Sequence, residues 1–238
     1  MRLAKYLAQA GIASRRQAEE LIAQKRVKLN GSVVTDLTTP VEPQSDRIEF
    51  DNQLVRIEES VYILLYKPAG FICTVNDPQG RATVLELVKA VRERIYPVGR
   101  LDYDTEGLLL LTNDGQFTNH IIHPRYKIDK KYEVLVQGNI KDSELNILRT
   151  GVKLEDGITA PAAVQLTRRD ASSSIIEMTI HEGRKRQVKR MCKAVGHPVI
   201  RLKRTALGFL TLEGLEPGQY RYLLQNEVVH LQAMALHE

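Results

Sequence analysis

The stretch of residues 98–112, VGRLDYDTEGLLLLT, places a polar loop that contains two glycines directly before an apolar segment. The continuous apolar run at 107–112 is followed by Asn113-Asp114-Gly115, which indicates a buried strand that ends in a turn. A carboxylate in this loop would lie at the edge of the core, exposed enough to react and still held rigidly. The charged side chains of the loop are Arg100, Asp102, Asp104 and Glu106.

The chain after residue 60 mixes strands and helices without strict alternation, which predicts an α+β fold with a mixed, largely antiparallel sheet. Apolar runs and alternation indicate strands at 61–66, 71–75, 131–137, 163–167, 174–180 and 199–204. Apolar residues at helical spacing indicate helices at 83–94, 142–149, 186–195 and 227–236.

The first 58 residues predict a small module of two helices and a hairpin. Ser14 and Gln17 form a capping-box pattern that begins one helix, and a preceding helix ends at Gly11. Asn30-Gly31 between apolar runs is a strong hairpin signal. A linker follows at 58–60, so we expect residues 1–58 to form this module and residues 59–238 to form a larger domain.

The composition is that of an ordinary globular protein. Of the 238 residues, 43% are hydrophobic and 26% are charged, which argues against disordered, collagen-like and coiled-coil classes. Every apolar run is far shorter than the roughly 18 residues of a membrane span, and the charged N-terminus does not resemble a signal peptide. With two cysteines and no export signal, we expect reduced thiols and a cytoplasmic protein.

Basic side chains gather in two segments, although the net charge of the chain is only +5. Residues 1–30 hold seven basic and two acidic side chains, and residues 181–204 hold nine basic and one acidic. Two basic patches on an otherwise acidic chain favour binding of a nucleic acid over the alternative of two solvated faces.

Taken alone, the acids of the 98–108 loop have two other interpretations. They are typical of turns and caps, and the loop by itself favours this structural role. Asp102 and Asp104 would also share one face of an extended backbone, as in a paired-carboxylate hydrolase. The chain has no tryptophan to stack on a sugar, which argues against a glycoside hydrolase.

Five segments together resemble one family. Gly99-Arg-Leu-Asp102, followed by Thr105-x-Gly107, resembles the catalytic motif of pseudouridine synthases, in particular the RsuA/RluB-type family that acts on ribosomal RNA. Residues 1–58 resemble the RNA-binding domain named after small-subunit ribosomal protein S-four. The remaining segments are Lys-Pro-x-Gly at 67–70, a Lys-x-Tyr-like segment at 130–132 and Glu-Gly-Arg-x-x-Gln-Val-Lys-Arg-Met at 182–191. The resemblance spans nearly the whole chain, in the order that the family has.

The resemblance implies isomerisation of a uridine within RNA, with Asp102 as the essential carboxylate, acting as nucleophile or as base at the sugar. It implies that Tyr132 stacks on the target base, whereas without it Tyr132 is better explained as a half-buried strand aromatic. Lys189 is the implied cationic partner of Asp102, with the neighbouring Arg190 as an alternative. Arg100 is expected to hold the opened base stack. The other expected RNA contacts are Arg15, Arg16, Lys28, Arg184, Arg186 and Arg190.

The predicted helix at 186–195 supports contact with RNA independently of the resemblance. One of its faces is apolar, and the neighbouring face is wholly basic, with Arg186, Lys189, Arg190 and Lys193. Four cations with no acid one turn away repel each other, and a bound phosphate would relieve this repulsion. A solvated basic face is the alternative.

We expect no cofactor and no metal, because the chain has no phosphate-binding glycine loop and no paired metal-ligand spacing, and isomerisation needs neither. The expected partner is ribosomal RNA or a pre-ribosomal particle, bound by a monomer that does not associate with membranes. The large-subunit RNA is slightly favoured over the small-subunit RNA, and the sequence does not indicate which uridine is modified. The competing hypothesis is a non-catalytic RNA-binding or ribosome-assembly factor.

Overall fold

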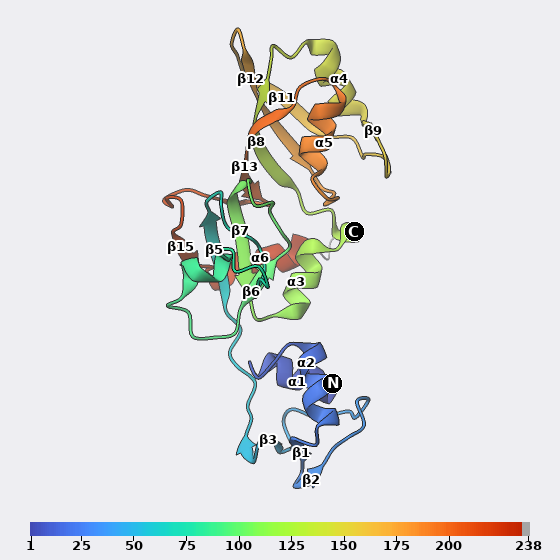
Figure 1. Ribbon diagram of the computed structural model, residues 1–238, viewed down its shortest axis with the longest axis vertical. Helices are drawn as coiled ribbons and strands as arrows, with labels where there is room; N and C mark the ends of the chain where they lie inside the picture. Colours follow the sequence, from blue (N-terminus) through green and yellow to red (C-terminus); the bar gives the residue numbers. More distant parts are fainter. Residues whose placement is uncertain (235–238) are drawn as a thin grey trace. The chain divides into compact units, whose positions relative to one another are not determined.

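The computed structural model describes residues 1–234 (Figure 1). The chain divides into two compact units, of which the first comprises Met1–Val61 with Arg92–Ile95 and the second comprises Tyr62–Val91 and the residues from Tyr96 onward. The sequence indicates a single boundary after residue 58 and does not indicate that 92–95 belong to the first unit. Within residues 1–234, no helix is long and apolar enough to cross a membrane.

The first unit contains two helices and a small antiparallel sheet. Ser14 caps the second helix through a capping box with Gln17, and the hairpin turns at Asn30-Gly31, so both predicted features are confirmed. Fully buried apolar side chains from both helices and from the sheet form one core. The elements are α1 (Leu3–Gln9), α2 (Arg15–Ala23), β1 (Val27–Leu29), β2 (Ser32–Val33), β3 (Ile48–Phe50) and β4 (Gln53–Leu54), with strand order β2-β1-β3-β4.

The second unit is built on a mixed sheet with the order β11-β12-β8-β13-β7-β5-β15. Only β13 and β7 are parallel among these neighbours, so the predicted α+β class with a largely antiparallel sheet is confirmed. Strand β6 pairs with β7, and β14 pairs with β13. The strands are β5 (Tyr62–Lys67), β6 (Tyr96–Val98), β7 (Glu106–Thr112), β8 (Lys130–Gln137), β11 (Ala163–Arg169), β12 (Ser173–Ile180), β13 (Val199–Leu207), β14 (Leu210–Thr211) and β15 (Tyr220–Tyr222).

Helices lie against both halves of this sheet. Helices α4 and α5 lie beside β8, β11 and β12, and α3 and α6 lie beside β5, β6 and β7 (Figure 1). Strand β7 is buried through Leu108–Leu111, as the apolar run predicts. The remaining elements are α3 (Gly115–Ile122), α4 (Asp142–Thr150), α5 (Gln187–Ala194), α6 (Gln225–Met234), the short 3-10 helices η1 (Val84–Val88) and η2 (Pro124–Tyr126), and the hairpin β9 (Lys153–Leu154) and β10 (Gly157–Ile158).

Two predicted elements are wrong. Residues 71–75 form no strand, because β7 and β15 already occupy both edges of β5. Ile72 instead forms an isolated bridge to Thr83. The helix expected at 83–94 is reduced to η1, because 92–95 belong to the other unit. The helix expected at 227–236 is α6, and residues 235 and 236 lie outside the described residues.

Candidate active site

The loop that carries Asp102 joins β6 to β7. Because these two strands are antiparallel neighbours, the loop begins and ends at the same end of the strand pair. Gly99 has a positive φ of 73°, which lets the chain turn out of β6. Within the loop, the backbone N–H of Thr105 donates to the carbonyl oxygen of Asp102 at 3.1 Å. The fold therefore presents Asp102 on a short, hydrogen-bonded turn.

A fully buried lysine holds this turn in place. The Nζ atom of Lys67 donates to the carbonyl oxygens of Asp102 at 3.2 Å, Thr105 at 2.7 Å and Pro68 at 3.0 Å. Burial lowers the pKa of Lys67, and the nearby acids of the loop act against that shift. The Sγ atom of Cys73 also accepts a hydrogen bond from the backbone N–H of Leu101 at 3.3 Å.

Asp102 lies beside a lysine of helix α5. The Nζ atom of Lys189 is 3.6 Å from Oδ2 of Asp102 and 2.5 Å from Oδ1 of Asp104. Only 11% of the Lys189 side chain is exposed, against 30% for Asp102, so solvent screens the pair incompletely. Burial acts to raise the pKa of Asp104, but the hydrogen bond and the charge of Lys189, with smaller contributions from a backbone hydrogen bond and Arg186, together lower it. The two acids of the loop thus share one cation.

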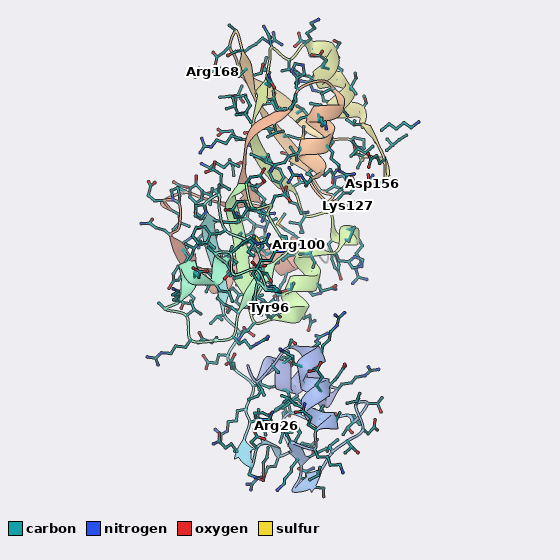
Figure 2. The ribbon with its side chains drawn as sticks, in the orientation of Figure 1. Arg26, Tyr96, Arg100, Lys127, Asp156 and Arg168 are labelled. Atoms are coloured by element: carbon teal, nitrogen blue, oxygen red, sulfur yellow. The ribbon has the colours of Figure 1, made fainter. Side chains whose placement is uncertain are left out.

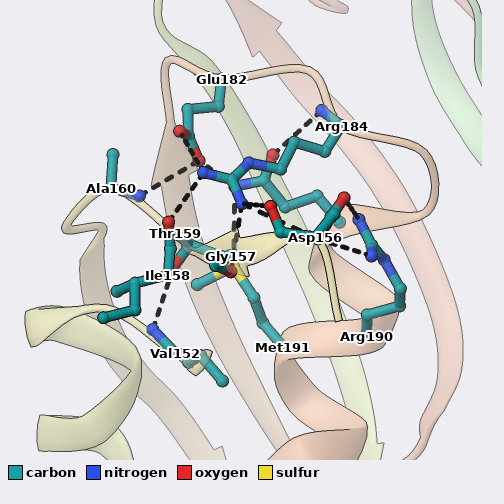
Figure 3. Close-up of polar contacts among 11 residues, drawn as sticks. Val152, Asp156, Gly157, Ile158, Thr159, Ala160, Glu182, Arg184, Arg190 and Met191 are labelled. Carbon is teal, nitrogen blue, oxygen red and sulfur yellow. Dashed lines mark hydrogen bonds and ion pairs between the residues drawn. The ribbon is translucent and has the colours of Figure 1, made fainter. Parts of the chain in front are cut away.

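Arg190, the alternative partner for Asp102, contacts Asp156 instead. Its guanidinium donates two hydrogen bonds to the carboxylate of Asp156, at 2.9 and 2.8 Å. Arg184 donates to the carbonyl oxygen of Ile158 at 2.7 Å and to Glu182 at 3.0 Å (Figure 3). These contacts fasten the hairpin β9–β10 to the segment around the start of α5. Of the two candidate partners for Asp102, the structure therefore places Lys189 beside it.

A pocket of about 160 Å³ opens beside Asp102. Its polar lining includes Asp102, Tyr132 and Arg204, and apolar side chains such as Leu202 and Leu207 complete its wall. Tyr132 lies on β8 with 8% exposure, directly across the sheet from Arg204 of β13. The pocket therefore combines a carboxylate and an aromatic ring with apolar walls, a lining that is typical of sites for small ligands.

Exposed cations lie around this pocket. Arg100 and Arg186 line it and are solvent-exposed, and Arg186 also lies 3.9 Å from Asp104 (Figure 2 labels Arg100).

The first unit carries its own expected RNA contacts, which are not among the residues that line this pocket. Arg15 and Arg16 are exposed on α2, and Nζ of Lys28 donates to Asn52 at 2.8 Å. Within residues 1–234, no group of three or more His, Cys, Asp or Glu side chains is placed to hold a metal ion.

Three residues of the site carry no role in the sequence analysis. The sequence indicates Lys67 only as part of the Lys-Pro-x-Gly segment, and its position at the end of an apolar strand does not distinguish a buried lysine from an exposed one. Lys130 and Arg204 line the pocket, whereas Lys67 lies outside its lining. Lys130 comes directly before the predicted strand at 131–137, and Arg204 is the last residue of the one at 199–204. The alternation of polar and apolar residues in these strands does not distinguish a buried cation from an exposed one.

Known proteins match both units of the chain. The model of the family described as RNA pseudouridylate synthase matches residues 61–194, and the S4 domain matches residues 1–48. The chain is 52% identical to ribosomal large subunit pseudouridine synthase B of Bacillus subtilis strain 168, over 99% of this chain and 97% of that protein. It is 46% identical to an uncharacterized RNA pseudouridine synthase of Aquifex aeolicus, over 97% and 93% of the two chains.

A solved structure agrees with these matches. The crystal structure of a pseudouridylate synthase superposes with a TM-score of 0.67 at 34% identity, and the match covers 97% of this chain and 99% of that one. The chain belongs to the RNA pseudouridylate synthase family and carries an S4 domain at its N-terminus. The family resemblance inferred from the sequence motifs is confirmed.

Proposed function

We propose that the protein isomerises a uridine of large-subunit ribosomal RNA to pseudouridine in the cytoplasm, with Asp102 as the essential carboxylate. The observation that carries this proposal is the 3.6 Å approach of Lys189 to Asp102 at the side of the pocket. The choice of large-subunit RNA is supported by the 52% identical relative, whose name specifies that substrate.

The reaction moves one bond of the nucleotide. The N1–C1′ glycosidic bond breaks with its electron pair leaving on uracil, the base turns, and C5 bonds to C1′. C5 then loses its proton to solvent, and N1 gains one, so the product is an isomer of the substrate. Asp102 acts at the sugar, as nucleophile or as base, with the ammonium group of Lys189 3.6 Å from its carboxylate.

The target uridine has to leave its base stack to reach Asp102, at a cost of a few kcal/mol. Tyr132 offers an aromatic surface within the pocket on which the extruded base stacks. Arg100, exposed on the same loop as Asp102, is placed to hold the opened RNA. Arg184 and Arg190 contribute to RNA binding through the hairpin β9–β10, which they hold.

The S4 domain supplies affinity for RNA. Arg15 and Arg16 are exposed at the start of α2, and Lys28 lies on β1 of the adjacent sheet. Phosphate contacts of this kind bind folded RNA by its shape, without reading its sequence.

Release of tritium from RNA labelled at uracil C5 tests the proposal, because C5 loses its hydrogen only when it bonds to C1′. Large-subunit and small-subunit ribosomal RNA are tested separately, each both naked and in pre-ribosomal particles. We expect release from the large-subunit RNA only. Release from the small-subunit RNA alone would contradict the substrate, and no release from any of them would favour a binding factor without catalysis.

A further inference from the structure

Arg204 is a buried cation within the pocket wall. It lies on β13 between Tyr132 of β8 and Gly107 of β7, its partners across the sheet on either side. It is 5% exposed, and its side chain lines the pocket beside Asp102. An arginine so placed loses most of its hydration, so its donors need protein or substrate acceptors.

The hydrogen bonds of Arg204 are incomplete. Its Nε donates to the carbonyl oxygen of Leu108 at 2.7 Å, which fixes the direction of the side chain. Its Nη2 is buried and has no hydrogen-bond partner among residues 1–234. No ion pair joins Arg204 to a carboxylate within the same range. A buried donor without a partner is costly, and functional sites are where proteins retain such groups.

A second cation lies in the same pocket. The Nζ atom of Lys130 donates to the carbonyl oxygens of Ile128 at 2.7 Å and His181 at 2.9 Å. Burial, and next the positive charge of Arg204, lower the pKa of Lys130 to about 8. The two positive charges therefore repel each other, and a negatively charged ligand between them would reduce this repulsion.

We propose that the Arg204 guanidinium donates a hydrogen bond to a carbonyl oxygen of the target uracil, O2 or O4, and stabilises the base when it is detached from the sugar. This inference rests on the proposed function. When the N1–C1′ bond breaks, its electron pair spreads over N1, O2 and O4, so negative charge develops where Arg204 lies. Arg204 keeps its own protons throughout, and the proton that N1 gains comes from solvent.

The pocket favours a base over a phosphate as the acceptor for Arg204. The neighbouring wall is apolar at Leu202 and Leu207, which suits the faces of a uracil. Phosphates remain near solvent, where the exposed Arg100 and Arg186 are available to them. A buried donor that is fixed in place before the reaction stabilises a developing anion strongly.

The first experiment compares Arg204→Lys with Arg149→Lys in the full-length protein. Arg149 is the matched control, because its Nε also donates to a backbone carbonyl oxygen, that of Val164, and it does not line the pocket. Tritium release is measured in single turnover with enzyme in excess, and RNA affinity and melting temperature are measured separately. We expect R204K to slow release about 100-fold with RNA affinity changed less than about threefold, and R149K to change release less than about threefold.

The second experiment separates contact with the base from a structural role. RNA carrying 2-thiouridine or 4-thiouridine at the mapped target presents sulfur, a weaker acceptor, at one carbonyl position. We expect one analogue to slow the wild-type protein and to slow R204K no further. An analogue effect that persists fully in R204K, or release by R204K at the wild-type rate, would overturn the role of Arg204. No release by the wild-type protein would instead overturn the proposed function.

If R204K does not fold, the wild-type protein still decides the question. The inference then requires that one of the two thio analogues slows release by the wild-type protein. Equal release from both analogues and from the unmodified RNA would refute it.

Discussion

The ammonium group of Lys67 donates a hydrogen bond to the backbone carbonyl oxygen of Asp102 at 3.2 Å, and it donates a second to Thr105 at 2.7 Å. One buried side chain at the end of β5 thereby fixes both ends of the turn that presents the Asp102 carboxylate. The position of the carboxylate depends on a cation that does not itself line the pocket.

Replacement of Lys67 by methionine should damage both stability and activity. The substitution removes the Lys67 donor from the carbonyl oxygens of Thr105 and Pro68, at about 1–3 kcal/mol for each, while the Asp102 carbonyl still accepts from the N–H of Thr105. We expect the free energy of unfolding to fall by about 2 kcal/mol or more and tritium release to fall at least about tenfold where the protein is still folded. Urea denaturation and the release assay measure these effects, with exposed Lys89→Met as the control. A variant K67M with wild-type stability and release would contradict this account.

Replacement of Lys189 should have a much larger effect than replacement of its neighbour Arg190. K189M removes the cation 3.6 Å from Asp102, and we expect release to fall about 100-fold or more. R190M breaks only the contact with Asp156 on the hairpin, so its release should fall less than about tenfold. Single-turnover release with saturating enzyme compares the two, and a larger loss in R190M would refute the assigned pairing.

Lys130 should make stability depend on pH in the alkaline range. Its pKa in the native protein is about 8, while the unfolded chain has the ordinary value of 10.5. Between these values the unfolded chain binds a proton that the native protein has released, so stability contributed by Lys130 rises with pH. Urea midpoints at about pH 8 and about pH 10 should therefore rise more in the wild-type protein than in K130M. An equal change in both proteins would contradict the burial of this cation.

The S4 domain should contribute the salt dependence of RNA binding. In the full-length chain, R15Q/R16Q removes two exposed cations, and the slope of log affinity against log salt should decrease by about 1 to 2. Tritium release at saturating RNA should stay within about twofold of wild type, because neither arginine lies in the pocket. The control R168Q/R169Q removes the same charge from β11. An unchanged slope in R15Q/R16Q would exclude Arg15 and Arg16 as phosphate contacts.

Local signals in the sequence predicted those elements whose structure is decided locally. The run at 107–112 became β7 because its side chains have no alternative to burial, and Ser14 with Gln17 capped α2 as its spacing predicts. The segments at 71–75 and 83–94 failed, because tertiary packing decided them. The edges of β5 were already occupied, and 92–95 joined the other unit.

The same distinction applies to the site. Motif resemblance singled out Asp102 and Lys189, and the fold brings them together through the loop before β7 and through helix α5. Arg190, one residue away, was the alternative to Lys189 in the sequence, and in the structure its guanidinium contacts Asp156. The buried positions of Lys67 and Arg204 were not predicted, because a cation beside apolar residues has the same sequence pattern whether it is exposed or enclosed.

The most direct test of the account compares tritium release by the wild-type protein, Asp102→Asn and Asp104→Asn on large-subunit ribosomal RNA. Both substitutions remove one charge from the same loop and one contact with Lys189. Melting temperature and RNA affinity show whether each variant is folded and bound. We expect release by the wild-type protein, release within about tenfold of wild type by D104N, and none by D102N. Release by folded D102N at a rate near that of the wild-type protein would contradict the central role of Asp102.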